Sequence, residues 1–452
     1  MAKRVLLVDA PFHAFFEYER WWYSFSCAQL AGCLLEKGIE TFVYDGDKYF
    51  KKDPLTKQRK EMVRRQGWYK DGVSKDDHYI WKHFRKTLDE LKPDIVGISV
   101  WTCSLSSSIK VLEICKDFNT NIKTCVGGYH VTALPDYFKN LPYVDTIFIG
   151  PAEEALPHWI LGGCKERFLA TDPRSVDIKK IPAPSRESLL YPEFFSSSDM
   201  GMLMASRGCP SNCSFCSNKL LTGQKYQFRT IPQIRQEIEH IITKYNVKSL
   251  NLIDANFLSN PTKALEIAEL IKSFGIPWGT AGLVNIITEE LIEKLIDCGC
   301  NSLAFGIESG SQTRLMKLNK KIRLEQIEKA AEILNRYKMN WKTFFIVGFP
   351  DDTLEEMEET RRFALKIRPS YISLNSFSPL PGTDIYNAWA PTFNYSIEDI
   401  AEYNQLNLKT DFMINMDLQT YRKKFTSILD EFDVYNAEVD SIEKFKNAEI
   451  KN

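Results

Sequence analysis

The feature that most constrains the fold is a regular alternation of short apolar runs with helical stretches along most of the chain. The first five apolar runs lie at residues 4–9, 40–45, 94–100, 122–128 and 144–150. Helical patterns separate most of them, and the first of these, residues 24–37, ends at Gly38. Apolar runs that end in polar turns are typical of buried parallel strands. The pattern predicts a doubly wound, Rossmann-like α/β domain over residues 1–150.

A second series of apolar runs begins near Gly201. Six runs lie at about 202–206, 248–254, 277–282, 302–308, 342–348 and 371–377, and amphipathic helical patterns separate them. A closed β/α barrel has eight such units. The series therefore predicts an open, partial (β/α)6 barrel over residues 201–390.

Three segments fall outside these two series. Residues 151–200 carry many prolines and lack clean periodicity, so we expect a linker between two domains. Residues 48–92 form a charged, aromatic insert, helical in part, which could cover the sheet or contact the second domain. Residues 391–452 predict helices that pack against the barrel or are partly disordered.

Composition narrows the partners and the compartment. The chain has 58 basic and 59 acidic residues, so no global field attracts nucleic acid or an anionic membrane. Asp9 ends the first apolar run, which is therefore too short for the apolar segment of a signal peptide or for a membrane span. We expect a cytoplasmic protein.

Eleven cysteines, an odd number, argue for reduced thiols rather than a disulfide framework. Eight lie in apolar stretches that predict core positions: Cys27, Cys33, Cys103, Cys115, Cys125, Cys164, Cys298 and Cys300. The other three, Cys209, Cys213 and Cys216, form a Cys-x3-Cys-x2-Cys loop after the first apolar run of the second domain.

Three thiolates on one short loop can ligate three irons of a cubane cluster and leave the fourth iron open to another ligand. The alternatives are a zinc site or three unrelated buried cysteines. A zinc site needs a fourth ligand in register, and His130 and His158 are distant in sequence. The spacing favours the cluster, which makes the three cysteines the candidate catalytic and metal-binding residues.

The loop, with Phe215 before its last cysteine, resembles the signature of the radical S-adenosylmethionine (SAM) superfamily. Further motifs resemble the branch of that superfamily that is fused to a cobalamin-binding domain, and they occur in the family's order: residues 228–230 (Phe-Arg-Thr), 253–257 (Ile-Asp-Ala-Asn-Phe), 305–310 (Phe-Gly-Ile-Glu-Ser-Gly), 347–350 (Val-Gly-Phe-Pro) and 379–383 (Pro-Leu-Pro-Gly-Thr).

The resemblance implies three cofactors: a [4Fe-4S] cluster, SAM and cobalamin. The open iron would chelate the amino and carboxylate groups of SAM, and one electron would cleave SAM to a 5′-deoxyadenosyl radical that abstracts a substrate hydrogen. The likeness implies methyl transfer to an unactivated carbon of a small molecule or natural-product intermediate. Ring contraction, cyclisation or oxidation on the same scaffold remains an alternative.

By motif position, the resemblance implies roles for residues of the barrel. Glu308 and Ser309 would bind the ribose or the amino acid part of SAM, and Gly348 with Phe349 would form an edge near the adenine. A surface salt bridge for Glu308, and turn-forming roles for Ser309 and Gly348, are the alternatives.

Three further polar residues have two interpretations each. Arg229 could pair with the carboxylate of SAM or anchor the cluster loop. Asp254 and Asn256 end a strand that faces the same cavity, and they could contact cofactor or substrate or simply form a turn.

In the first domain, a ligand is expected outside the carboxyl ends of the parallel strands. The candidate cobalamin-binding residues in these loops are Ser99, Thr102, Ser104, Gly127, Gly128, His130, Gly150 and Glu153. Glycine pairs would let a corrin edge and its nucleotide tail approach the backbone, or would serve tight turns instead.

Cobalamin domains that supply a lower axial histidine carry Asp-x-His-x-x-Gly after the first strand. This chain has Asp9-Ala-Pro-Phe-His13 with no glycine in register. The departure implies that cobalamin binds without a protein histidine below cobalt, or that the domain has lost cobalamin. His13 could cap the corrin or the substrate, or be packed among the aromatic residues around it.

Two other classes of protein are less well supported. A non-catalytic cobalamin or Fe-S sensor would not need the motifs downstream of the cysteine loop, so their presence argues against this class. An RNA methylthiotransferase would carry a second three-cysteine set and a basic tail. We expect a small-molecule or peptide substrate, an electron donor such as flavodoxin or ferredoxin, no nucleic acid and no membrane.

Overall fold

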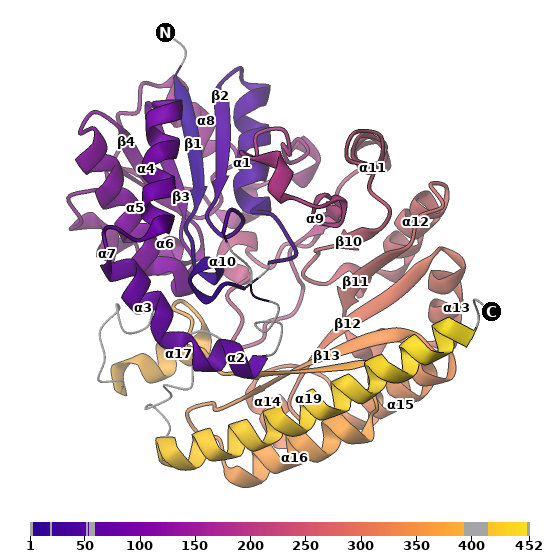
Figure 1. Cartoon of the computed structure of the whole chain (residues 1–452). Helices are drawn as coiled ribbons and strands as arrows, with labels where there is room; N and C mark the ends of the chain where they lie inside the picture. Colours follow the sequence, from indigo (N-terminus) through magenta and orange to yellow (C-terminus); the bar gives the residue numbers. More distant parts are fainter. Residues whose placement is uncertain (1–2, 19, 51–52, 54–58, 393–414, 450–452) are drawn as a thin grey trace.

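The computed structural model describes residues 3–18, 20–50, 53, 59–392 and 415–449. Two parallel sheets lie side by side with helices packed against them (Figure 1). This arrangement confirms the predicted α/β fold of a Rossmann-like domain followed by a partial barrel and a helical tail.

The first sheet has six parallel strands in the order β2-β1-β3-β4-β5-β6. Their bounds are β1 Arg4–Asp9, β2 Glu40–Asp45, β3 Ile95–Ser99, β4 Lys123–Gly127, β5 Thr146–Ile149 and β6 Phe168–Ala170. The first five match the predicted strands. The sixth, β6, lies in the segment expected to be a linker; it is a short edge strand, and two of its three residues are exposed, so it has no continuous apolar run.

Helices cover both faces of this sheet, because alternate residues of each strand point to opposite sides. Val5 and Leu7 of β1 face the layer of α1 (Phe25–Glu36) and α8 (Ala155–Leu161). Leu6 and Val8 face the layer of α4, α5, α6 and α7, whose bounds are Tyr79–Leu91, Leu105–Phe118, Tyr129–Ala133 and Pro135–Lys139.

The insert at residues 48–92 contains α2 (Arg59–Arg64), α3 (Gln66–Ser74) and α4. Trp81 and Phe84 of α4 are buried against the first sheet, so this part of the insert covers the sheet. The α2 segment lies against the C-terminal helix instead. The α4 part of the insert therefore covers the sheet, and the α2 part contacts the C-terminal helix.

The second sheet has six parallel strands in sequential order, β7-β10-β11-β12-β13-β14. Their bounds are β7 Met202–Leu203, β10 Leu250–Leu252, β11 Trp278–Gly282, β12 Cys300–Glu308, β13 Asn340–Val347 and β14 Tyr371–Ser376. In the described strands β7 and β14 do not pair with each other, so the barrel is open, as predicted.

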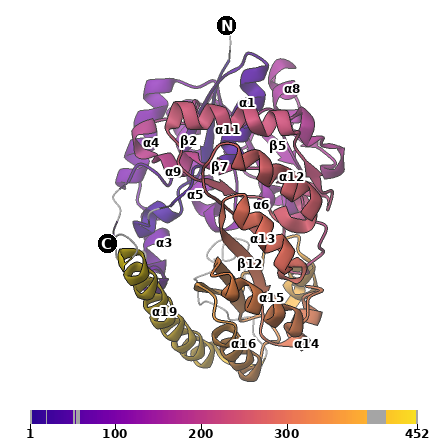
Figure 2. The ribbon, with the colours of Figure 1, turned by 90° about the vertical axis from the view of Figure 1, so that its right-hand side faces the viewer.

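Helices follow the strands of this sheet and cover its outer face (Figure 2). They are α11 Ile231–Tyr245, α12 Pro261–Lys272, α13 Glu289–Asp297, α15 Leu324–Arg336 and α16 Leu354–Lys366. The predicted helical tail contains α19 (Leu418–Glu449), which packs on β14 and α16 and buries Tyr421, Phe425 and Phe432. Residues 393–414 of the predicted tail lie outside the described residues.

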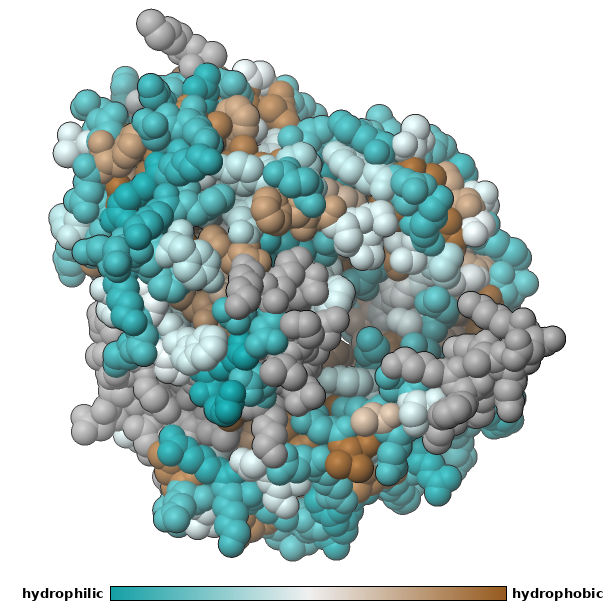
Figure 3. All heavy atoms as spheres, in the orientation of Figure 1, coloured by the Kyte–Doolittle hydropathy of each residue, from teal (hydrophilic) through white to brown (hydrophobic). Residues whose placement is uncertain are grey.

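The face of the molecule in Figure 3 is covered mostly by hydrophilic side chains, with separate small apolar patches. Among the described residues no helix has both the length and the apolar character that a membrane span requires.

Candidate functional site

The three cysteines lie on a loop that leaves a short antiparallel ribbon. The ribbon pairs β8 (Ser206–Arg207) with β9 (Gln227–Phe228), and the loop between them leads into α10 (Lys219–Thr222). Gly208 opens the loop with φ of 95°, and a Cβ there would lie 1.9 Å from the carbonyl oxygen of Lys225. Only glycine fits this turn, which delivers the chain directly to Cys209.

The thiols are close enough to affect one another's ionisation. Burial raises the pKa of Cys213 to about 11, and the nearby thiols and Glu308 add to this rise while Lys320 opposes it. Burial also raises the pKa of Cys216. These thiols are protonated at neutral pH, and a bound metal would replace their protons.

In the described part of the chain, the three loop cysteines are not gathered around one zinc-sized position. Ligands of one tetrahedral zinc ion, with Zn–S bonds near 2.3 Å, lie about 3.8 Å apart. In the described part of the chain, the only trio of potential ligands within 4.8 Å of one another is Glu269, Asp297 and Cys298, away from the loop. Cys209, Cys213 and Cys216 therefore do not all lie within 4.8 Å of one another, which favours the cluster over a single zinc ion.

A buried ion pair lies next to the loop. Glu308 ends β12 with φ of 73°, and its Oε1 accepts a hydrogen bond from Nζ of Lys320 at 2.9 Å. Nζ also lies 5.9 Å from the ring centroid of Phe215. Burial alone would lower the pKa of Lys320, but Glu308 and then Cys213 outweigh it, so the pKa is raised. The carboxylate of Glu308 could pair with the amino group of SAM, and the ammonium of Lys320 could pair with its carboxylate.

Ser309 and Gly348 have the turn-forming contacts that were their alternative interpretation. Ser309 Oγ lies 3.2 Å from Oγ1 of Thr360 on α16 and accepts a hydrogen bond from the amide of Ser311. Gly348 has φ of 86°, and a Cβ there would lie 2.6 Å from the hydroxyl of Tyr421. Both residues therefore hold the ends of strands against outer helices.

The other predicted polar residues of the barrel mainly fix the cluster loop. Arg229 donates to Glu237 at 2.5 Å and to the carbonyl of Met204 at 3.2 Å, which favours the anchoring alternative. Asp254 accepts hydrogen bonds from the amides of Ala205 and Ser206 and from the Ser206 hydroxyl. Burial raises the pKa of Asp254 to about 6. Asn256 donates to Sγ of Cys209 at 3.8 Å.

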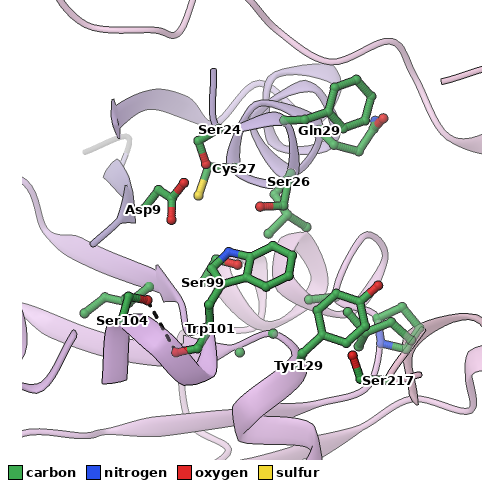
Figure 4. A pocket seen from close by; sticks show the side chains of 18 of the residues that line it. Asp9, Ser24, Ser26, Cys27, Gln29, Ser99, Trp101, Ser104, Tyr129 and Ser217 are labelled. Atoms are coloured by element: carbon green, nitrogen blue, oxygen red, sulfur yellow. Dashed lines mark hydrogen bonds between the residues drawn. The ribbon is translucent and has the colours of Figure 1, made fainter. Parts of the chain in front are cut away.

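A cavity of about 830 Å³ lies between the carboxyl ends of the first sheet and the two ends of the cluster loop (Figure 4). From the first domain it is lined by Asp9, Ser99, Thr102, Ser104, Gly127, Gly128, Gly150 and Glu153. From the barrel it is lined by Ser206, Arg207, Gly208, Ser217 and Asp254. The strand order reverses between β1 and β3, where an open α/β sheet is expected to bind its ligand.

The cavity continues as a slot between the first sheet and α1. Leu7, Gly97 and Cys125, which are neighbours in register, form its floor, and Cys27 and Leu30 of α1 line it too. Gly97 lies two residues before the end of β3, so the slot reaches about 7 Å inward from the strand ends. A glycine inside a strand permits close approach of a ligand. The slot and the strand-end loops fit the predicted nucleotide tail and corrin edge of cobalamin.

The side chain of His130 does not line this cavity, so the structure does not bring it together with the other predicted cobalamin-binding residues. Nδ1 of His130 lies 3.1 Å from Oγ1 of Thr102, and the residue is 1% exposed. Burial lowers the pKa of His130 to about 4, so the imidazole is neutral. Helix α6, which follows Gly128, directs the His130 side chain into the interior of the domain. There it contacts Thr102, and Thr102 in turn lines the cavity.

Sequence reasoning missed several residues of the site. Lys320 follows the fourth barrel strand by twelve residues and has no motif spacing of its own. Trp101 and Tyr129 form an aromatic pair at the cavity with ring centroids 5.1 Å apart (Figure 4). The hydroxyl of Tyr129 donates to Asn218 at 3.4 Å, so this pair also reaches the cluster loop.

An ion pair joins the two sides of the cavity. Arg207, two residues before Cys209, pairs with Glu153, and the two side chains are 12% and 11% exposed. A Glu153→Ala variant leaves a buried guanidinium without its carboxylate and should lower the free energy of unfolding by about 3 kcal/mol. Urea denaturation tests this. Glu290→Ala, which removes an exposed pair with Lys294 on α13, is the matched control and should leave the unfolding midpoint unchanged.

Two family models match this chain. The model of the radical SAM superfamily matches residues 203–364, and that of the B12 binding domain matches residues 60–160. The first match contains the cysteine loop, and the second contains β3, β4 and β5 with their cavity loops. The chain is a radical SAM enzyme with a B12-binding domain. The corresponding cofactors are a [4Fe-4S] cluster, SAM and cobalamin.

Two relatives with similar sequences are named as methyltransferases. An uncharacterized methyltransferase of Pyrococcus horikoshii is 29% identical over 348 residues, which cover 72% of this chain and 75% of the relative. Bacteriochlorophyllide d C-8(2)-methyltransferase of Chlorobaculum tepidum is 27% identical, covering 70% of this chain and 72% of that protein.

A solved structure shares the fold of this radical SAM enzyme. The radical SAM methyltransferase TsrM of Kitasatospora setae, with its tryptophan substrate and a SAM analogue bound, superposes with a TM-score of 0.62 at 14% identity. The match covers 86% of this chain and 76% of TsrM.

Proposed function

We propose that this radical SAM enzyme is a cobalamin-dependent methyltransferase that acts on an unactivated carbon of a small molecule. The observation that carries the proposal is a cavity that both domains line. Asp9, Ser99 and Gly127 contribute from the first sheet, and Ser206 and Ser217 contribute from the ends of the cluster loop. Methyl donation and hydrogen abstraction must reach the same carbon, so the two cofactors must face one substrate site.

The residues of the chain have distinct parts in this chemistry. Cys209, Cys213 and Cys216 hold the cluster, and Glu308 with Lys320 binds the amino acid part of SAM. When bound, the reduced cluster supplies the electron that cleaves SAM, and cobalamin supplies the methyl group. The walls of the cavity are mostly apolar and exclude water and other hydrogen donors that would quench a radical.

We also propose an apolar body for the substrate. Trp22, Trp101 and Tyr129 line the cavity with Met202 and Met204, and such side chains favour flat or hydrophobic ligands. The named activities of relatives, on a bacteriochlorophyllide and on a hopanoid, are consistent with this class. A flavodoxin or ferredoxin as electron donor and a cytoplasmic location are parts of the same proposal.

Product stoichiometry separates methylation from a radical rearrangement. Methylation should form 5′-deoxyadenosine and S-adenosylhomocysteine in equal amounts, because one SAM provides the radical and a second remethylates the carrier. The assay uses methyl-deuterated SAM and a metabolite extract of cells that lack the gene, with mass spectrometry of the products. Deoxyadenosine that accumulates without S-adenosylhomocysteine or a deuterated product would favour rearrangement, cyclisation or oxidation.

A further inference from the structure

A second groove, of about 840 Å³, lies beside the β8–β9 ribbon. Strand β8 lines the cavity between the two domains, whereas β9 lines this groove. The groove is completed by the segment around η5 (Ile178–Lys180) and by the N-terminal ends of α11 and α12. None of the described residues lines both spaces, so the ribbon that carries the cluster loop separates the groove from the cavity.

Tyr226, which lines the groove, connects it to the cluster loop. A Cβ on Gly208, the residue before Cys209, would lie 3.4 Å from Cα of Tyr226. The Tyr226 hydroxyl donates to the carbonyl oxygen of Asn256 at 2.9 Å. Nδ2 of Asn256 in turn donates to Sγ of Cys209 at 3.8 Å. Two hydrogen-bonded residues therefore lead from the groove to a cluster ligand.

The groove has an excess of positive charge. The charged residues that line it are Asp177, Lys179, Lys225, Arg229, Lys263 and Glu266. Two of the cations are neutralised, because Lys263 pairs with Glu266 and Arg229 pairs with the buried Glu237. Nζ of Lys225 donates to two backbone carbonyls, at 3.0 and 3.1 Å.

Two exposed lysines of η5 add to this charge. Lys179 and its neighbour Lys180 have no carboxylate partner among the residues that the structure describes. Lys179, Lys180 and Lys225 therefore stand against one carboxylate, Asp177, which accepts the amide hydrogen of Lys179 at 3.1 Å. The chain as a whole has a net charge of −1, so this excess is a local feature.

Two helix dipoles have the same sign. Helix α11 has 15 residues and α12 has 12, and both begin at the groove, after the capping residues Thr230 and Asn260. A helix N-terminus carries a partial positive charge. Lysines and helix ends together favour a negatively charged partner on this side of the cluster loop.

We propose that this groove is the docking surface for the protein that reduces the cluster, a small acidic one-electron carrier. The inference rests on the proposed function, of which such a donor is a part. One electron leaves the reduced carrier and takes the [4Fe-4S] cluster from the 2+ to the 1+ state, and no atom is transferred. A donor bound here lies close to Cys209 and leaves the cavity free for SAM and substrate. Opposite charges also speed the encounter.

A double charge reversal, Lys179→Glu with Lys180→Glu, tests the proposal. The reconstituted full chain is titrated calorimetrically with an oxidised flavodoxin and, separately, with an oxidised ferredoxin at low ionic strength. For the donor that binds the unaltered chain, Kd should rise at least about tenfold, and the difference should shrink at high salt. SAM cleavage driven by that donor should fall, whereas cleavage driven by dithionite should not change, because a small reductant needs no docking surface.

A matched variant controls for the change in net charge. Lys329→Glu with Lys423→Glu makes the same change on the exposed sides of α15 and α19, and it should keep the Kd of the unaltered chain. An equal loss of affinity in both variants would mean that net charge alone attracts the donor, and the proposal would be wrong. Unchanged affinity in the groove variant, or no binding of either donor to the unaltered chain, would also overturn it.

Failure of this proposal is distinguishable from failure of the proposed function. Each of the contradicting results leaves methyl transfer driven by dithionite intact, and the proposed methyltransferase activity stands with it. Absence of methyl transfer with dithionite, while the donor still binds the groove, would contradict the proposed function and not the docking surface.

Discussion

A Cys213→Ala variant forms no 5′-deoxyadenosine from SAM above the chemical background. Cys213 is the most buried of the three loop cysteines, and its loss leaves two thiolates for a cluster that needs three. We expect cleavage to fall by at least about a thousandfold, in the range seen when an essential catalytic group is removed. The measurement is deoxyadenosine by liquid chromatography after anaerobic reconstitution and reduction with dithionite.

Cys300→Ala is the matched control for this variant. Cys300 is also a buried cysteine of the barrel, but it begins β12, at the opposite end of the strand from Glu308. It should keep its iron and its cleavage activity. Full cleavage activity in Cys213→Ala would show that the cluster assignment is wrong.

The second large effect concerns the first domain. Gly127→Leu should weaken cobalamin binding by at least about tenfold, or about 1.4 kcal/mol. Gly127 lines the cavity, and a Cβ there would meet Phe148 at an ordinary 3.4 Å with open space elsewhere. The backbone therefore accepts a β-carbon at this position, and we expect the rest of the leucine side chain to occupy the volume proposed for the corrin. Titration of the apoprotein with hydroxocobalamin, followed by its visible spectrum, measures the change.

The specificity of this second effect can be checked in the same preparation. Deoxyadenosine formation should persist in Gly127→Leu, because the cysteine loop is not altered. Gly67→Leu on α3, where a Cβ meets nothing within 4 Å, controls for an added leucine. Unchanged cobalamin affinity in Gly127→Leu would place the binding site elsewhere.

The fold was predictable because buried parallel strands produce continuous apolar runs in the sequence. The run 302–308 predicted β12 (Cys300–Glu308) to within two residues, since parallel strands buried on both faces are continuously apolar. The same reasoning missed β6, whose residues are partly exposed at a sheet edge. The two-residue strands β8 and β9 are too short to produce a pattern.

The site was predictable only where its residues are adjacent in the chain. The cysteine loop satisfies that condition, and so do Gly127 and Gly128. Ion pairs at the site join residues that are far apart in sequence: Glu153 with Arg207, and His13 with Asp47. Local spacing carries no information about such pairs. His130 follows a glycine pair, a position that predicted a ligand contact, but its side chain is buried beside Thr102, because local spacing does not give the direction of a side chain.

One anaerobic preparation tests the central claim most directly. The protein is reconstituted with iron, sulfide and hydroxocobalamin, and its iron content, bound cobalamin and deoxyadenosine release are measured together. The account predicts about four irons and one cobalamin per chain, together with SAM cleavage after reduction. Four irons and cleavage without bound cobalamin would contradict a cavity shared by two cofactors, and a preparation without any cluster would contradict the account as a whole.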